Sequence, residues 1–244
     1  QHIAYHDSLT ELPNRAYFHA ELAKAVEASR TEPGTRFAVM FLDLDRFKVV
    51  NDSLGHFYGN ELLREVGQRI QQCLRRKEVV ARLGGDEFAV LLRDLHDSDD
   101  GTVLAERILH ALSQPLPIGG TEIIPSASVG VTFSDLGYRT VDELLRDADL
   151  AMYEAKAAGR GRVAVFDRTM HERIADKLAL EADLRHAIGE GELSLSYQPL
   201  FDLEPHRLVG FEALARWQHP TRGAVSPAVF VALAEEAGHI EALT

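Results

Sequence analysis

The 244-residue sequence has a single cysteine, Cys73, and no long apolar run, and each of these absences excludes a class of protein. One cysteine cannot build an intramolecular disulfide framework, and it suits a reducing cytosol. No stretch approaches the roughly 20 apolar residues that cross a bilayer, so we expect a soluble, cytoplasmic chain. The chain begins at Gln1 without an initiator methionine or a signal-peptide pattern. We therefore expect a segment of a longer protein whose upstream sensor domain is missing. Whether the longer protein also has a membrane anchor upstream is left open.

Positive charge is also scarce. The chain has 26 Lys and Arg residues against 38 Asp and Glu residues, a net charge of -12. A general nucleic-acid surface needs clustered cations, so we expect no nucleic-acid partner, although local Lys and Arg side chains can still bind a nucleotide. The sequence contains no Gly-Lys pair, which excludes a P-loop.

The length and the apolar content predict a globular protein with more than one domain. At 244 residues the chain exceeds a typical domain, and 45% of its residues are hydrophobic, which is normal for a packed core. One complete domain and part of another is the expected organisation.

The stretch RLGGDEFAVLL, from Arg82 to Leu92, predicts a β-hairpin. Glycine accepts the positive φ that a tight turn needs, so Gly84 and Gly85 mark the turn between two apolar arms. Asp86 and Glu87 are then carried at the turn. Taken alone, they fit either a solvated acidic turn or the hard oxygen ligands of a divalent cation.

A second acidic turn is predicted at Asp43-Leu44-Asp45, directly after the apolar run of residues 37–42. An unbroken apolar run ended by polar residues indicates a strand that is covered on both faces. Such a strand would deliver Asp43 to the rim of the sheet. If the hairpin lies beside this strand, Asp43 and Asp86 converge on one point, and two carboxylates together with substrate phosphates are what Mg²⁺ prefers.

Four motifs in one order carry a family resemblance: DSLTELPNR, FLDLDRFKVVNDSLGH, RLGGDEF and DADLAMYEAKAAGRGRV. Together they resemble the GGDEF family of diguanylate cyclases. The resemblance implies that two GTP molecules condense into cyclic di-GMP and pyrophosphate with Mg²⁺ or Mn²⁺. It also implies an α/β (α+β) fold similar to the nucleotide-cyclase and polymerase palm, with helices flanking a central sheet. Because each domain would hold one GTP, a homodimer is needed for catalysis.

The resemblance also implies roles for individual residues. Asp43, the carbonyl of Leu44, Asp86 and Glu87 would hold the metal, while Asp86, Glu87 and Lys48 would be catalytic. Asn51 would read the guanine edge, and Lys156 and Arg160 would reach the phosphates. The full set of GTP-binding residues that the resemblance implies is Arg46, Phe47, Asn51, His56, Asn60, Gly85, Lys156 and Arg160. From the residues alone, Lys48 also fits a solvated helix lysine, and Lys156 and Arg160 fit partners of a helix C-terminus.

Two positions depart from the family pattern. Asn60 stands where the family has an aspartate that accepts hydrogen bonds from guanine, so one acceptor oxygen is kept and the charge is lost. A charged hydrogen bond contributes about 1.5 to 3 kcal/mol against about 1 kcal/mol for a neutral one, which predicts a loss of about tenfold in affinity. Arg75 and Glu78 occupy a candidate site for inhibition by cyclic di-GMP, with glutamate in place of aspartate. A cluster of cations at a helix end is the alternative explanation.

The last part of the chain predicts a connecting helix and then a second domain. Met170, Ile174, Leu178, Leu184 and Ile188 form one apolar seam along residues 168–191.

After this helix, LSLSYQPLFDL and RLVGFEALARWQHP predict a β-hairpin that resembles the opening of an EAL domain, the family of cyclic di-GMP phosphodiesterases. The resemblance implies that Glu212 is a metal ligand and that Gln198, Leu214 and Arg216 contact substrate. We expect a GGDEF domain at 1–167, a connecting helix at 168–191 and an incomplete EAL barrel at 192–244. A lone ligand cannot assemble a catalytic metal site, so no phosphodiesterase activity is expected from this chain.

Two functions follow from these patterns. In the first, the chain is an active diguanylate cyclase from a GGDEF-EAL signalling protein. In the second, the GGDEF part binds GTP and regulates a downstream EAL phosphodiesterase. The intact acidic and phosphate-binding residues favour the first function, and Asn60 favours the second.

Overall fold

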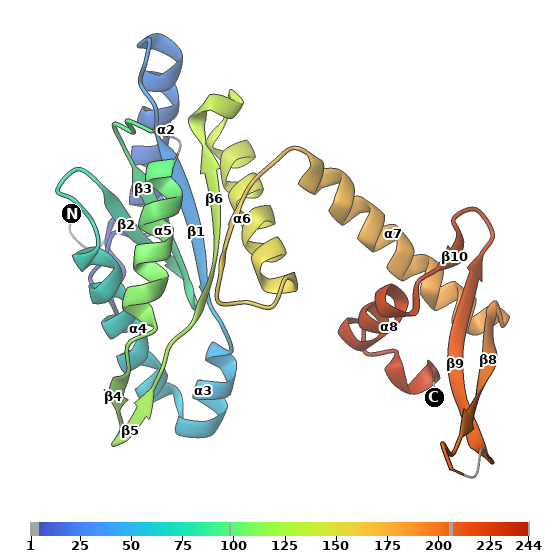
Figure 1. Ribbon diagram of the computed structural model, residues 1–244. Coiled ribbons are helices and arrows are strands. Elements are labelled where there is room, and N and C mark those ends of the chain that lie inside the picture. Colours follow the sequence, from blue (N-terminus) through green and yellow to red (C-terminus); the bar gives the residue numbers. More distant parts are fainter. Residues whose placement is uncertain (1–4, 98, 205–206, 244) are drawn as a thin grey trace. The chain divides into compact units, whose positions relative to one another are not determined.

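The computed structural model describes residues 5–97, 99–204 and 207–243, and the chain divides into two compact units, Gln1–Met170 and His171–Thr244 (Figure 1). Each unit contains a hydrophobic core of its own. Among the described residues, no helix is both long enough and apolar enough to span a membrane.

The first unit is an α/β domain built on a five-stranded sheet with the strand order β2-β3-β1-β6-β7. β1 is antiparallel to both of its neighbours, β3 and β6, whereas β6 and β7 are parallel. The expected fold class, a central sheet flanked by helices, is confirmed. The elements in chain order are α2 (Arg15–Thr31), β1 (Ala38–Leu44), α3 (Phe47–Leu54), α4 (His56–Gln72), β2 (Val79–Gly84), β3 (Glu87–Leu92), α5 (Asp99–Leu112), β4 (Leu116–Ile118), β5 (Thr121–Ile123), β6 (Ala127–Phe133), η1 (Ser134–Leu136), α6 (Val141–Ala157) and β7 (Val163–Val165).

The central strand β1 is covered on both faces, as its apolar run predicts. Alternate side chains of a strand point to opposite faces, so Met40 and Leu42 join one core layer while Val39 and Phe41 join the other. α4 and α5 supply the first layer, and α2 and α6 supply the second (Figure 1). The alternation fixes which side chains of β1 reach the two layers.

The strand runs further than the sequence suggests. β1 continues through Asp43 and Leu44, and Asp43 is paired with Glu87 of β3 on one side and with Ser128 of β6 on the other. The expected acidic turn at Asp43 is therefore wrong, and the chain turns only at Asp45. Pairing on both sides holds the backbone of Asp43 extended, which a pattern of apolar residues does not reveal.

β6 and α6 approach each other at Gly130. A Cβ at this position would lie 2.1 Å from the carbonyl oxygen of Ala148 and 2.2 Å from the amide nitrogen of Met152. Real Cβ atoms do not come this close to backbone, so only glycine fits between the strand and the helix. This contact packs the helix that carries Lys156 directly on the sheet.

The second unit contains a three-stranded antiparallel sheet with the order β10-β9-β8. Its elements are α7 (Thr169–Glu190, which begins at the end of the first unit), β8 (Leu193–Phe201), β9 (Leu208–His219), β10 (Gly223–Val225), α8 (Pro227–Glu236) and η2 (Ile240–Leu243). The expected hairpin is present, and α8 follows it. The described residues contain no closed barrel, which is consistent with an incomplete EAL domain.

The apolar seam of α7 differs from the expected one. Leu178 is exposed, whereas Leu180, Leu184 and Ala187 are buried against Trp217 and α8. Leu184 and Ile188 of the expected seam do pack in this core, and Met170 is buried in the first unit. Leu178 is exposed while Leu180 and Ala187 are buried, because α8 and the hairpin decide which side of the helix is covered.

Candidate functional site

The hairpin and the central strand bring three acidic residues to one edge of the sheet. Asp43 and Glu87 are directly opposite each other in the β1–β3 register. The amide of Leu44 donates a 3.3 Å hydrogen bond to the carbonyl oxygen of Asp86, which places the turn against the end of β1. The structure therefore brings Asp43, Asp86 and Glu87 together from two segments that are far apart in sequence.

The turn between β2 and β3 has the conformation that its glycines predict. Gly84 has a φ of +143° and Gly85 a φ of +53°, which L-residues with side chains rarely adopt. The predicted hairpin is confirmed, since residues of β2 pair antiparallel with β3 from Val79 to Gly84.

Two cations neutralise this acidic edge. Lys156 of α6 places its Nζ atom 2.8 Å from Oδ1 of Asp43, and Arg15 of α2 places its Nη2 atom 3.5 Å from Oε2 of Glu87. Burial raises the pKa of Asp43 although Lys156 opposes the shift, and the charges of Asp86 and Asp45 add to it. Burial likewise raises the pKa of Glu87 against the opposing charge of Arg15, with Asp149, Asp43 and Asp86 adding to the increase.

These residues fit a hard divalent cation. Among the described residues, no group of three or more His, Cys, Asp or Glu side chains is already arranged to hold a metal. The donors at this edge are nevertheless carboxylates and a backbone carbonyl, which is the chemistry that Mg²⁺ accepts when substrate phosphates and water complete its coordination. Burial is the main cause of the raised pKa values of Asp43 and Glu87, and the neighbouring carboxylates add to it, so a bound cation would stabilise their charged forms.

Arg46 and Arg160 lie on a cavity beside this edge. The cavity has a volume of about 400 Å³ and is lined by Arg46, Val49, Ile124, Ser126, Arg160 and Gly161, among others. Arg46 has a φ of +59° and immediately precedes α3, so the chain turns sharply between β1 and the helix. The two guanidinium groups give this cavity a positive character that suits phosphate oxygens.

Asp45 organises the cavity, a role that the sequence analysis missed. Its carboxylate accepts hydrogen bonds from Oγ of Ser126 at 2.6 Å, from Oγ of Ser128 at 2.7 Å and from the amide of Gly161 at 3.0 Å. These bonds join the end of β1 to the start of β6 and to the loop that carries Arg160. The only signal in the sequence was the second aspartate of Asp43-Leu44-Asp45, because the partners lie about 80 and 116 residues away.

α3 and α4 carry the remaining residues implied for nucleotide binding. Asn51 of α3 lies against Gly59 of α4, where a Cβ would come within 1.9 Å of Oδ1 of Asn51. Lys48, His56 and Asn60 are exposed. Gly59 is a second residue that the sequence analysis missed. Because it has no side chain, it leaves the space that the Asn51 amide occupies.

Arg75 and Glu78 lie at the start of the hairpin, between two further cavities of about 60 Å³ and about 400 Å³. The Glu78 carboxylate accepts a 2.6 Å hydrogen bond from the backbone amide of Arg75. Glu78 therefore closes its own turn, and the exposed Arg75 side chain is left facing the cavities.

The residues implied for an EAL site lie on one face of the β8–β9 hairpin. Gln198 is directly opposite Glu212, and Leu214 and Arg216 follow at intervals of two residues, so all four side chains share a face. Gln198 and Glu212 are exposed. Trp217, on the opposite face, is buried in the core of the second unit, so it serves packing rather than the site.

The fold and this edge define an α/β domain with an acidic, cation-lined site at one end of its central sheet. The chain belongs to the GGDEF family, because residues 4–162 match the family model described as "Diguanylate cyclase, GGDEF domain". Residues 181–244 match the EAL domain family.

Three proteins of Pseudomonas aeruginosa illustrate the similarity. The chain is 42% identical over 238 residues to MucR, a bifunctional diguanylate cyclase/cyclic di-GMP phosphodiesterase, covering 98% of this chain and 34% of MucR. It is 41% identical over 241 residues to the cyclic di-GMP phosphodiesterase NbdA, covering 99% of this chain and 30% of NbdA. A structure of the GGDEF domain of TpbB, also called YfiN, superposes with a TM-score of 0.67 at 39% identity, over 70% of this chain and 99% of that domain. The chain thus spans about a third of the length of the two curated relatives.

The contact between Asn51 and Gly59 gives a test of the nucleotide-binding region. Gly59→Ala should weaken the binding of a fluorescent GTP analogue about fivefold, because the new methyl group displaces the Asn51 amide, and a hydrogen bond is worth about 1 kcal/mol. Asn51→Ala should weaken binding by the same factor, and the double variant by no more than either single one. Additive losses in the double variant would show that Gly59 does not act through Asn51. Thermal unfolding of each variant controls for loss of structure.

Proposed function

We propose that this chain is a diguanylate cyclase that condenses two molecules of GTP into cyclic di-GMP and pyrophosphate. The observation that carries the proposal is the single sheet edge at which Asp43, Asp86 and Glu87 meet beside Lys156, with Arg46 and Arg160 on the adjoining cavity. Membership of the GGDEF family and the similarity to MucR support it.

Each group at the edge has a role in this reaction. Mg²⁺ or Mn²⁺ would be held by Asp43, Asp86, Glu87 and the carbonyl of Leu44. When bound, the metal would neutralise charge on the triphosphate and lower the pKa of the attacking ribose 3′-hydroxyl. Lys156 exchanges Asp43 for the phosphates when the nucleotide binds, because the two anions compete for one ammonium group. Arg160 and Arg46 hold phosphate oxygens, and Lys48 stabilises the charge that develops during phosphoryl transfer.

Recognition of the base is assigned to α3 and α4. Asn51 of α3 lies against Gly59, which belongs to the N-terminal part of α4 and directly precedes Asn60. Phe47, His56 and Gly85 complete the group of residues around the nucleotide. Asn60 offers guanine a neutral acceptor, so we expect weaker binding of GTP than an aspartate would give.

The reaction needs two copies of the domain. One domain holds one GTP, and the 3′-hydroxyl of each nucleotide attacks the α-phosphate of the other, so two copies face each other across a two-fold axis. We assign this work to residues 1–167, with 168–191 connecting them to the EAL part at 192–244. We also propose that cyclic di-GMP binds at Arg75 and Glu78 as an inhibitor. We further propose that the protein acts in the cytoplasm.

A second function is favoured by two observations. Asn60 removes the charged acceptor for guanine, and NbdA, a relative of similar identity, is named as a phosphodiesterase. In this alternative the GGDEF part binds GTP and regulates a downstream EAL phosphodiesterase. Glu212 alone does not make a metal site in the second unit, so neither function assigns hydrolysis to this chain.

Incubation of the purified dimer with GTP and Mg²⁺ decides between these functions. We expect cyclic di-GMP and pyrophosphate, detected by chromatography and a phosphate-release assay, and no product from Asp86→Ala because the variant loses a carboxylate of the metal site. A dimeric wild-type sample that binds GTP but forms no product would leave the regulatory function as the correct one. Removing Mg²⁺ with a chelator should abolish product formation in the same way.

Asn60→Asp tests the base-recognition assignment. The restored charge should tighten GTP binding about tenfold, since hydrogen bonds to charged groups are worth roughly 1.5 to 3 kcal/mol. ATP affinity should stay the same or fall, because adenine offers the carboxylate no comparable pair of donors. The matched control is Gln72→Glu, which adds a charge at an exposed position at the other end of α4 and should leave GTP binding unchanged. Equal gains for GTP and ATP in Asn60→Asp would contradict the assignment.

A further inference from the structure

The two-glycine turn that carries Asp86 has little packing of its own. A Cβ at either Gly84 or Gly85 would meet no atom within 4 Å, apart from the chain immediately beside it. Glycine also has the greatest conformational freedom of any residue, so an unsupported pair would let the turn sample many conformations. The β1–β3 pairing holds Glu87, and the amide of Leu44 holds the Asp86 carbonyl, but the Gly84-Gly85 backbone before them needs a contact from outside the turn.

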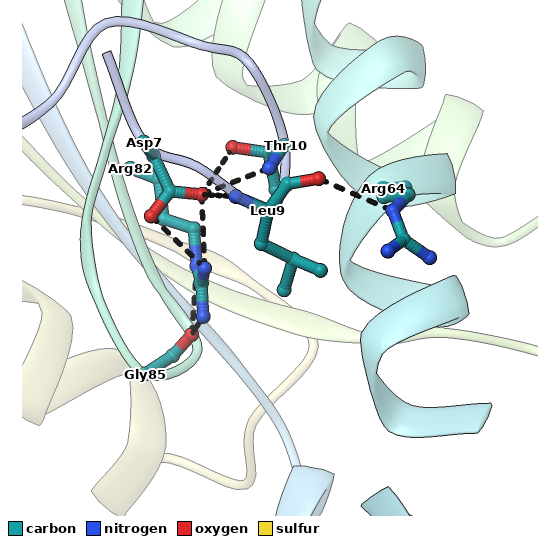
Figure 2. A network of polar contacts seen from close by, with 6 residues as sticks. All are labelled: Asp7, Leu9, Thr10, Arg64, Arg82 and Gly85. Carbon is teal, nitrogen blue, oxygen red and sulfur yellow. Dashed lines mark hydrogen bonds and ion pairs between the residues drawn. The ribbon is translucent and has the colours of Figure 1, made fainter. Parts of the chain in front are cut away.

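Arg82 provides this support from the last part of β2. Its Nε atom donates a 3.0 Å hydrogen bond to the carbonyl oxygen of Gly85, and its Nη2 atom donates a 2.6 Å hydrogen bond to the same oxygen (Figure 2). The guanidinium group spans the turn and fixes the peptide that directly precedes Asp86. A charged donor makes these bonds stronger than neutral ones.

Asp7, near the N-terminus, holds Arg82 in this position. Nη1 of Arg82 lies 3.0 Å from Oδ1 and 3.2 Å from Oδ2 of Asp7 (Figure 2). The pair is largely buried, with 11% of the Arg82 side chain and 21% of the Asp7 side chain exposed. Removal of either partner would therefore leave a charge in a partly desolvated place.

Asp7 is itself fixed by the turn that follows it. Its Oδ1 atom accepts hydrogen bonds from the amide of Thr10 at 2.9 Å, the hydroxyl of Thr10 at 2.8 Å and the amide of Leu9 at 3.3 Å. Burial alone would raise the pKa of Asp7, but the bonds from Thr10 and Arg82 outweigh burial and lower it. Asp7 is therefore ionised at neutral pH and remains a partner for Arg82.

The N-terminal segment meets the hairpin at further points. The amide of Arg82 donates to the carbonyl oxygen of Pro13 at 2.9 Å, and Nε of Arg15 donates to the carbonyl oxygen of Leu83 at 3.3 Å. Arg64 of α4 ties the same segment to the domain through the carbonyl oxygen of Leu9 at 3.2 Å (Figure 2). Residues 7–15 thus lie along β2 up to the turn and are anchored on both sides.

We propose that Arg82 is a positioning residue for the cyclase reaction, and that Asp7 acts through it to hold the Gly84-Gly85 turn in the conformation that presents Asp86 and Glu87. This inference rests on the proposed function. The geometry makes the N-terminal segment part of the machinery that sets the metal-binding edge, although no residue of Asp7–Thr10 contacts that edge itself. Displacing Asp7 would release the turn without touching an acidic ligand.

Two variants and a matched control test the proposal. Asp7→Asn removes the charge that holds Arg82. Arg82→Lys keeps a positive charge for Asp7, but an ammonium group lacks the planar fork that reaches Asp7 and the Gly85 carbonyl together. The control is Glu21→Gln, which breaks the 2.6 Å ion pair between Arg93 and Glu21. That pair ties α2 to the chain just after β3, at the end of the hairpin away from the turn.

Amide hydrogen exchange in the peptide of residues 83–88 is the first measurement, because it does not depend on turnover. We expect exchange about tenfold faster in Asp7→Asn and Arg82→Lys, since a charged hydrogen bond is worth more than about 1.4 kcal/mol, and no change in Glu21→Gln. The Mg²⁺ concentration for half-maximal turnover should rise by a similar factor in the first two variants alone. Thermal unfolding of Arg82→Lys should stay close to that of the wild type.

The outcomes separate this inference from the proposed function. Unchanged exchange in Arg82→Lys, or equal acceleration in Glu21→Gln, would overturn the positioning role whether or not the protein makes cyclic di-GMP. Faster exchange confined to the first two variants supports the positioning role even if the wild type yields no product, in which case only the cyclase assignment fails.

Discussion

The antiparallel pairing of β1 with β3 is the constraint on which the rest of the site depends. It places Asp43 directly opposite Glu87 and brings the Asp86 carbonyl to the amide of Leu44. A slip of one residue would turn Asp43 to the other face of the sheet and carry Leu42 and Leu44 out of their core layer. The buried alternation along β1 therefore fixes the geometry of the acidic edge, and packing energy in the core maintains the alignment of charged groups at the rim.

The acidic edge also explains the cations around it. Three carboxylate-bearing residues at one place repel each other, and the raised pKa values of Asp43 and Glu87 reflect their burial and mutual charge. Lys156 and Arg15 balance that charge from the two helices on the same face, α6 and α2. In the proposed reaction the metal would take over as the partner of the carboxylates. Lys156 would then leave Asp43 and pair with the phosphates of the nucleotide.

Much of this arrangement follows from sequence, because its signals are local. The apolar run at 37–42 predicted a doubly covered strand, and Gly84-Gly85 predicted the hairpin. What the sequence did not reveal depends on pairs that are distant along the chain. Nothing in the local pattern shows that Asp7 meets Arg82 or that Asp45 binds the amide of Gly161. The strand extension through Asp43 and the exposure of Leu178 on α7 were likewise decided by neighbouring elements rather than by periodicity.

Crystals of the chain grown with Mn²⁺ and a non-hydrolysable GTP analogue give the most direct test of the central claim. We expect an anomalous difference peak for manganese between the carboxylates of Asp43 and the hairpin residues Asp86 and Glu87, with Lys156 moved from Asp43 to the phosphates. A nucleotide bound elsewhere, or manganese absent from this edge while the nucleotide is fully occupied, would contradict it.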